Sequence, residues 1–93
     1  MRTDAFLDFL QTRFQSRSQK PLSLQAAQDV ISRCKRVEKA FGVDLDGLTP
    51  VEIEAIEHRV RVESDRFGFT GRVDRARRDV IGAVRYYAVF RSH

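Results

Sequence analysis

The sequence predicts an all-α protein folded as a compact four-helix bundle, and three observations support this prediction. Apolar residues recur at spacings of three and four along most of the chain, which is the period of an amphipathic helix. The chain has only two prolines and five glycines, and all of them except Gly82 stand at a place where a helix could begin or end. A strong helix-start motif, Thr-Pro-Val-Glu, stands at residues 49–52. The helices are expected at about residues 3–14, 23–41, 50–66 and 71–91.

The size and composition of the chain favour one folded domain over residues 1–93. Apolar residues make up 42% of the sequence, and the charged residues are mixed in sign, which argues against disorder. No segment approaches the roughly 20 apolar residues that a membrane-spanning helix needs, and the first residues lack the apolar block of a signal peptide. We therefore expect a cytoplasmic protein that does not bind a membrane.

The first helix is expected to begin with Thr3 as its N-cap residue. A polar segment at residues 15–22 separates it from the next helix. Its apolar face is expected to contain Phe6, Leu7, Leu10 and Phe14.

The second helix is expected to begin after Ser23 as N-cap and to end before Gly42, because glycine readily adopts the left-handed conformation that closes helices. Cys34 lies in the middle of its apolar stripe, so it is interpreted as a core residue with a suppressed thiol. With a single cysteine, no disulfide within the chain is expected. The stripe has a strict three-four alternation and consists of Ala27, Val30, Cys34, Val37 and Phe41.

The third helix should begin at a capping box formed by Thr49 and Glu52, with Pro50 at the first helical position. Val51 and Val62 fall off its apolar face. That face is expected to contain Ile53, Ile56 and Val60 and to continue to Phe67.

The fourth helix is expected to begin at Thr70 or Gly71. Three arginines and a glycine lie opposite its apolar face on a helical wheel. The apolar face is expected to contain Val73, Ala76, Val80, Val84 and Tyr87, with Tyr86 toward the flank.

The positive charge is concentrated on particular segments. Residues 72–91 carry six arginines against two aspartates, a net charge of +4 that equals the charge of the whole chain. Residues 13–39 carry seven basic residues against two acidic ones, whereas residues 40–66 carry three against seven. The second and fourth helices are therefore basic, and the third helix with its preceding loop is acidic. Such segregation indicates a charged partner, for which a nucleic acid fits best.

Few residues in the sequence are suited to catalysis or metal binding. His58 lies one helical turn after Glu54, but no nucleophile motif accompanies the pair, so His58 is interpreted as a surface residue. Asp44 and Asp46 resemble the start of a calcium loop, but Ile53 stands where such a loop needs a glutamate. We therefore expect a turn at these aspartates, and neither enzyme activity nor a cofactor or metal.

Six basic residues are expected to contact the phosphates of duplex DNA, three on each basic helix. They lie on or beside the helix faces that point away from the apolar stripes. If both faces open on the same side of the bundle, they form a surface able to straddle DNA; the alternative is a pair of ordinary solvated faces. The expected contacts are Arg33, Arg36, Lys39, Arg75, Arg78 and Arg85.

Three parts of the chain share a further pattern: residues 6–10, residues 21–23 with 37–42, and residues 77–90, where arginines and small residues precede aromatics. Together they resemble the N-terminal core-binding, SAM-like domain of tyrosine recombinases and phage integrases. The resemblance implies a bundle that clamps duplex DNA through its second and fourth helices, in a phage or another mobile element and associated with the nucleoid. The recombinase catalytic domain is missing, so recombination by this chain alone is not expected.

An alternative function is a small protein interaction module, such as an inhibitor or adaptor of phage or plasmid type. It would dock its basic face on an acidic protein and its acidic helix on a basic one, and segregated charge would serve it equally well. A homodimer through Val51 and Val62 is a further expectation of this alternative.

Overall fold

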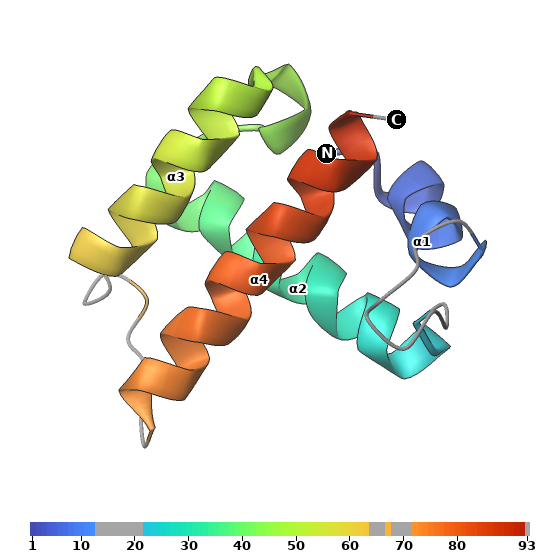
Figure 1. Ribbon diagram of the computed structural model, residues 1–93, viewed down its shortest axis with the longest axis horizontal. Helices are drawn as coiled ribbons and strands as arrows, with labels where there is room; N and C mark the ends of the chain where they lie inside the picture. Colours follow the sequence, from blue (N-terminus) through green and yellow to red (C-terminus); the bar gives the residue numbers. More distant parts are fainter. Residues whose placement is uncertain (13–21, 64–66, 68–71, 93) are drawn as a thin grey trace.

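The computed structural model describes residues 1–12, 22–63, 67 and 72–92. Within these residues the chain forms helices and turns and no β-strand, so the predicted all-α fold with four helices is confirmed. Helix α4 crosses in front of α2, with α3 along one side and α1 along the other (Figure 1). The elements are α1 (Thr3–Thr12), α2 (Leu24–Phe41), a 3-10 turn η1 (Leu45–Gly47), α3 (Pro50–Val62) and α4 (Val73–Arg91).

The predicted helix ends agree with the structure at α2 and at the start of α3. The Ser23 hydroxyl accepts a hydrogen bond from the Ala26 N–H, and Gly42 closes α2 in the left-handed conformation with φ of 64°. The capping box is complete, since the Glu52 N–H donates to Thr49 over 3.2 Å and the Thr49 N–H donates to Glu52 over 3.1 Å.

Other predicted boundaries differ from the structure. Thr3 is the first residue of α1 and not its N-cap, since the Phe6 N–H already bonds the Arg2 carbonyl. Helix α3 ends at Val62, earlier than expected. The Val62 side chain is exposed, so a further helical turn at this point would have no core surface to pack against. Helix α4 begins at Val73, two residues later than expected. Phe14, residues 64–66, Thr70 and Gly71 lie outside the described residues.

Helix α4 is the centre of the bundle, because it packs against each of the other three helices. Because of this arrangement, α4 has buried residues on more than one side. They include Ile81 and Ala83, which were not part of the apolar face predicted for this helix. In contrast, Val73 is 40% exposed, so its predicted core position is wrong. The first turns of α4 extend beyond α2 and α3 (Figure 1), so none of the helices described covers the turn that carries Val73.

Aromatic rings fill the core on both sides of α4. The Phe6 ring of α1 meets the Tyr87 ring edge-on with centroids 4.8 Å apart, and on the other side Phe67 meets Phe41 edge-on at 5.5 Å. The predicted core residues of α3 and the predicted burial of Phe67 and Tyr87 are confirmed. The core residues of α3 are Ile53, Ile56 and Val60.

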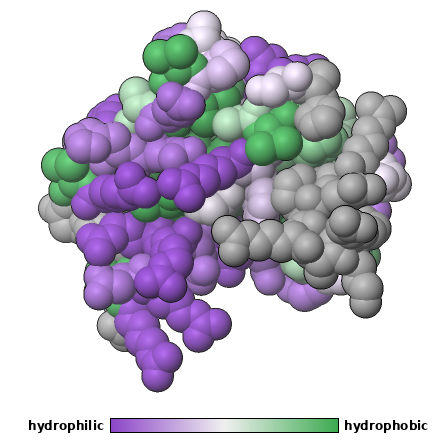
Figure 2. Space-filling model, viewed as in Figure 1, coloured by the Kyte–Doolittle hydropathy of each residue, from purple (hydrophilic) through white to green (hydrophobic). Residues whose placement is uncertain are grey.

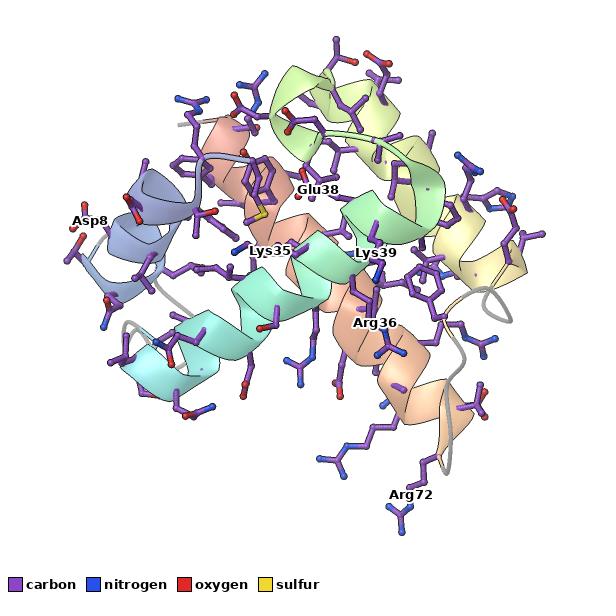
Figure 3. All side chains as sticks on the ribbon, turned by 180° about the vertical axis from the view of Figure 1, so that it is seen from behind. Asp8, Lys35, Arg36, Glu38, Lys39 and Arg72 are labelled. Atoms are coloured by element: carbon purple, nitrogen blue, oxygen red, sulfur yellow. The ribbon has the colours of Figure 1, made fainter. Side chains whose placement is uncertain are left out.

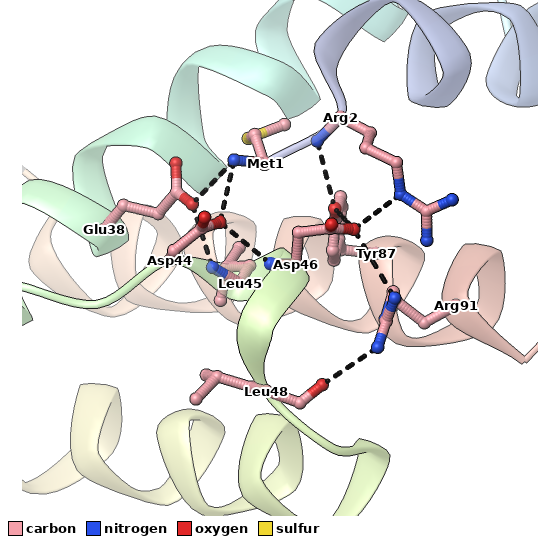
Figure 4. A network of polar contacts seen from close by, with 9 residues as sticks. All are labelled: Met1, Arg2, Glu38, Asp44, Leu45, Asp46, Leu48, Tyr87 and Arg91. Atoms are coloured by element: carbon pink, nitrogen blue, oxygen red, sulfur yellow. Dashed lines mark hydrogen bonds and ion pairs between the residues drawn. The ribbon is translucent and has the colours of Figure 1, made fainter.

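A polar network ties the start of the chain to η1 and to the end of α4 (Figure 4). The Asp46 carboxylate accepts hydrogen bonds from Arg2 Nε at 2.6 Å and from the Tyr87 hydroxyl at 2.9 Å, and Arg91 lies 3.5 Å away. The Arg2 hydrogen bond, assisted by Tyr87, holds the pKa of Asp46 below its usual value. Burial raises the pKa of Tyr87 to about 12. The aspartate thus joins three segments and keeps Tyr87 a hydrogen-bond donor.

A second carboxylate, that of Glu38 on α2, belongs to the same polar network. Its Oε2 atom accepts from the Leu45 N–H at 2.9 Å and from the Met1 amino group at 3.3 Å, while Asp44 accepts from that amino group at 2.8 Å. The Asp44 side chain also accepts from the Asp46 N–H over 3.0 Å. The turn predicted at the two aspartates is therefore a 3-10 turn held by side-chain caps.

We predict that Asp46→Asn lowers the free energy of unfolding by about 1 kcal/mol at pH 7, because the amide replaces a charged acceptor of several hydrogen bonds. The folded-state pKa of Asp46 lies below that of the unfolded chain, so its stabilisation is complete above the unfolded value and is lost as pH falls through the folded value. Urea unfolding should therefore separate the variant from the parent at pH 7 and much less at pH 2. Asp8→Asn on the exposed side of α1 is the control, and equal losses would contradict the network.

We also predict that Cys34 resists thiol reagents in the folded protein. Its side chain is fully buried, Sγ donates to the Ala83 carbonyl over 3.3 Å, and burial raises the pKa of the thiol to about 12. The reactive thiolate should therefore be about a thousandfold scarcer than in the unfolded chain. Labelling with an aromatic disulfide reagent at pH 8 with and without urea measures the ratio, and comparable rates would contradict it.

Candidate nucleic-acid interface

The exposed side of α4 and the end of α3 carry a cluster of arginines. The inward sides of α4 are covered by the other helices, which leaves its polar residues facing outward. Strongly hydrophilic side chains cover the protruding half of α4 in the space-filling view (Figure 2). We call this cluster the arginine surface; it consists of Arg61, Arg72, Arg75, Arg77, Arg78 and Arg85.

Two open depressions connect the members of the arginine surface. The first, about 700 Å³, is lined by residues 72–75 with Arg78 and Asp79. The second, about 420 Å³, lies between α4 and Arg61 at the end of α3, and Asp74 and Arg78 border both depressions. Arg78 therefore stands where the two join, and the surface is continuous along α4.

Some arginines on this side of the bundle are paired with carboxylates. Arg77 lies 2.7 Å from Asp74, one turn earlier in α4, and Arg85 lies 3.1 Å from Glu57 of α3. The Asp74 carboxylate is exposed, so the pair with Arg77 is weak, whereas the Glu57 carboxylate is only 13% exposed and the exposed partner in that pair is Arg85.

Arg72, Arg75 and Arg78 are exposed and have no ion-pair partner within the described part of the chain. They repeat at intervals of three residues, so they follow one side of the first two turns of α4. Guanidinium groups bind phosphate or carboxylate oxygens through paired hydrogen bonds. The helix N-terminus adds a partial positive charge to this end of the surface.

The structure brings four of the six residues predicted as DNA contacts together around α4. Arg75 and Arg78 line the first depression, and Arg33 reaches this region from α2 through an ion pair of 4.0 Å with Asp79. Arg85 borders the second depression. These four residues lie around α4.

The other two predicted contacts, Arg36 and Lys39, lie apart on α2 (Figure 3). They line a separate depression of about 350 Å³ together with Ala40 and Phe67. The Arg36 guanidinium donates to the Phe67 carbonyl, so it helps to hold Phe67 against α2. This contact gives Arg36 a structural role, although both Arg36 and Lys39 are exposed.

Three members of the arginine surface, Arg61, Arg72 and Arg77, were not among the DNA contacts predicted from the sequence. Arg61 belongs to a segment with net negative charge, and counting charge by segment concealed its position beside α4. Arg77 lies close to the apolar face on a helical wheel, but its long side chain reaches the surface. Arg72 was part of the basic run, which was the only signal available for it.

The described residues place limits on other chemistry. They contain no group of three or more side chains able to hold a metal ion. Among the same residues, no helix is long and apolar enough to cross a membrane.

The class defined by these observations is an all-α helical bundle with an arginine-rich central helix. No family model matches the chain, and no match was found among curated proteins or solved structures. The resemblance to the core-binding domain of tyrosine recombinases therefore stays a prediction that rests on the residues quoted for it.

Proposed function

We propose that this protein is a non-enzymatic DNA-binding module that contacts the phosphates of duplex DNA through its basic helices. The observation that carries the proposal is the row of Arg72, Arg75 and Arg78, exposed and without ion-pair partners among the described residues. Unpaired guanidinium groups in one row provide the sequence-independent part of DNA affinity, because each phosphate contact releases bound counterions.

The shape of α4 supports contact with a DNA groove. Its first turns extend beyond the other helices (Figure 1), and the major groove, about 12 Å wide, admits one α-helix. Arg75 and Arg78 would meet phosphates first, with Arg33 joining from α2 and Arg85 exchanging Glu57 for a phosphate. Lys39 and Arg36 would extend the contact along α2 where DNA reaches that side.

A second candidate function is binding to an acidic protein. Asp74 and Asp79 lie within or beside the arginine surface, and they would repel a continuous line of phosphates. Separate carboxylates of a protein partner could meet the arginines between these aspartates. Capture from cell lysate with and without nuclease distinguishes the two functions, because only a DNA-mediated complex is lost after nuclease.

We predict that Arg75→Gln with Arg78→Gln weakens binding to a labelled duplex at least about tenfold at low salt. The slope of log affinity against log salt should become shallower by about two, since two phosphate contacts are lost. Fluorescence anisotropy titrations over a series of salt concentrations measure both quantities.

The matched control is Ala5→Glu with Ser92→Glu. It removes the same net charge at exposed positions on α1 and after α4, and it should leave most of the affinity and the salt slope unchanged. Equal effects of the two double variants would assign the binding to net charge alone. Absence of binding by the parent protein at low salt would refute the proposal.

A further inference from the structure

Helix α3 has an exposed stripe on its outer side, with a valine at each end, in addition to the face that it buries. Val51 is 74% exposed and Val62 is 67% exposed, and Ala55 and His58 are exposed between them. The four residues follow one another at steps of four, three and four. Hydrophobic areas are visible along the outer margin of α3 (Figure 2).

This spacing is the one by which two helices pair in a coiled coil. The fold itself does not use the stripe, because α3 packs against α4 through Ile53, Ile56 and Val60 on the opposite side. Exposed valines at both ends of a helix of 13 residues lower the solubility of the protein and do not stabilise the monomer. The stripe therefore fits an intermolecular contact.

The charges that flank the stripe indicate which partner it takes. Glu54 and Arg61 lie on the same side of the stripe, seven residues apart, toward opposite ends of the helix. Neither has an ion-pair partner among the described residues. On the other side, Glu52 and Arg59 repeat the order of charges, but Arg59 is already bonded to Glu63 over 2.9 Å. The acidic half of α3 is thus complementary to its own basic half.

We propose that two copies of this protein pair through the outer stripes of α3 in an antiparallel arrangement. A twofold axis perpendicular to the two helices then sets Val51 against the partner's Val62 at each end. Antiparallel pairing brings equivalent flanks together, so Glu54 faces the partner's Arg61, and Arg61 faces the partner's Glu54. Parallel pairing would instead set Glu54 near the partner's Arg59, which is already bonded to Glu63 within its own helix.

A depression beside the stripe adds room for this pairing. It measures about 540 Å³, lies between α3 and α4, and is lined by Glu54, Glu57, Arg85, Ala88 and Val89. The guanidinium of the partner's Arg61 would approach from this side, while its methylene groups could cover Val89, which is 40% exposed. The contact is short, about 16 Å from Val51 to Val62, so the dimer belongs among the weak interfaces.

Sedimentation velocity without nucleic acid tests the proposal, and its outcome is independent of DNA binding. The parent protein should shift from monomer to dimer with a dissociation constant in the range of about 0.1 mM. Glu54→Arg and Arg61→Glu should each weaken self-association at least about tenfold, because each places like charges opposite one another twice. A mixture of the two variants should form a heterodimer, since every flanking pair is then opposite in charge.

Asp8→Arg on α1, a charge reversal remote from α3, is the control and should leave the dimer unchanged. Val51→Asp with Val62→Asp should abolish association, and far-ultraviolet circular dichroism should show that each variant keeps its helices. A parent protein that stays monomeric at 1 mM, or a mixture that fails to associate more strongly than either variant alone, would overturn the proposal.

Discussion

The burial of α4 by the other three helices is the constraint on which the rest of the structure depends. Val80, Val84 and Tyr87 are almost fully buried, and neighbouring positions face different helices. Since so much of the helix circumference is covered in its second half, long charged side chains can only lie on the remaining outer side or in the uncovered first turns. The arginine surface is therefore a consequence of core packing as well as of composition.

Tyr87 connects this core to the polar junction at the other end of the molecule. Its ring packs against Phe6, whereas its hydroxyl donates to Asp46 and accepts from the Arg2 N–H at 3.2 Å. A buried tyrosine needs such partners, because leaving its hydroxyl buried without a hydrogen bond would cost about 1–3 kcal/mol. The junction thus fixes α1 and η1 relative to α4, while the opposite end of α4 stays open for contacts with another molecule.

The outer faces of α3 and α4 suit different kinds of partner. The face of α4 has arginines around open depressions and little apolar surface, which suits a polyanion. The face of α3 has exposed valines at both ends of a stripe in coiled-coil spacing, flanked by acidic residues toward its start and basic ones toward its end, which suits another helix. Arg61 borders both, so a dimer and a DNA complex would compete for it or share it.

Local sequence determined where α2 begins and ends and where α3 begins, because the caps of Ser23, Gly42 and Thr49 depend only on nearby backbone groups. It also determined the core faces of these helices through their periodicity. Only the tertiary structure decided that Val73 stays exposed, that Arg36 bonds the Phe67 carbonyl, and that Arg61 joins the arginines of α4. These outcomes depend on how far one helix extends past another and on how segments distant in the chain meet. Helical periodicity carries no information about either.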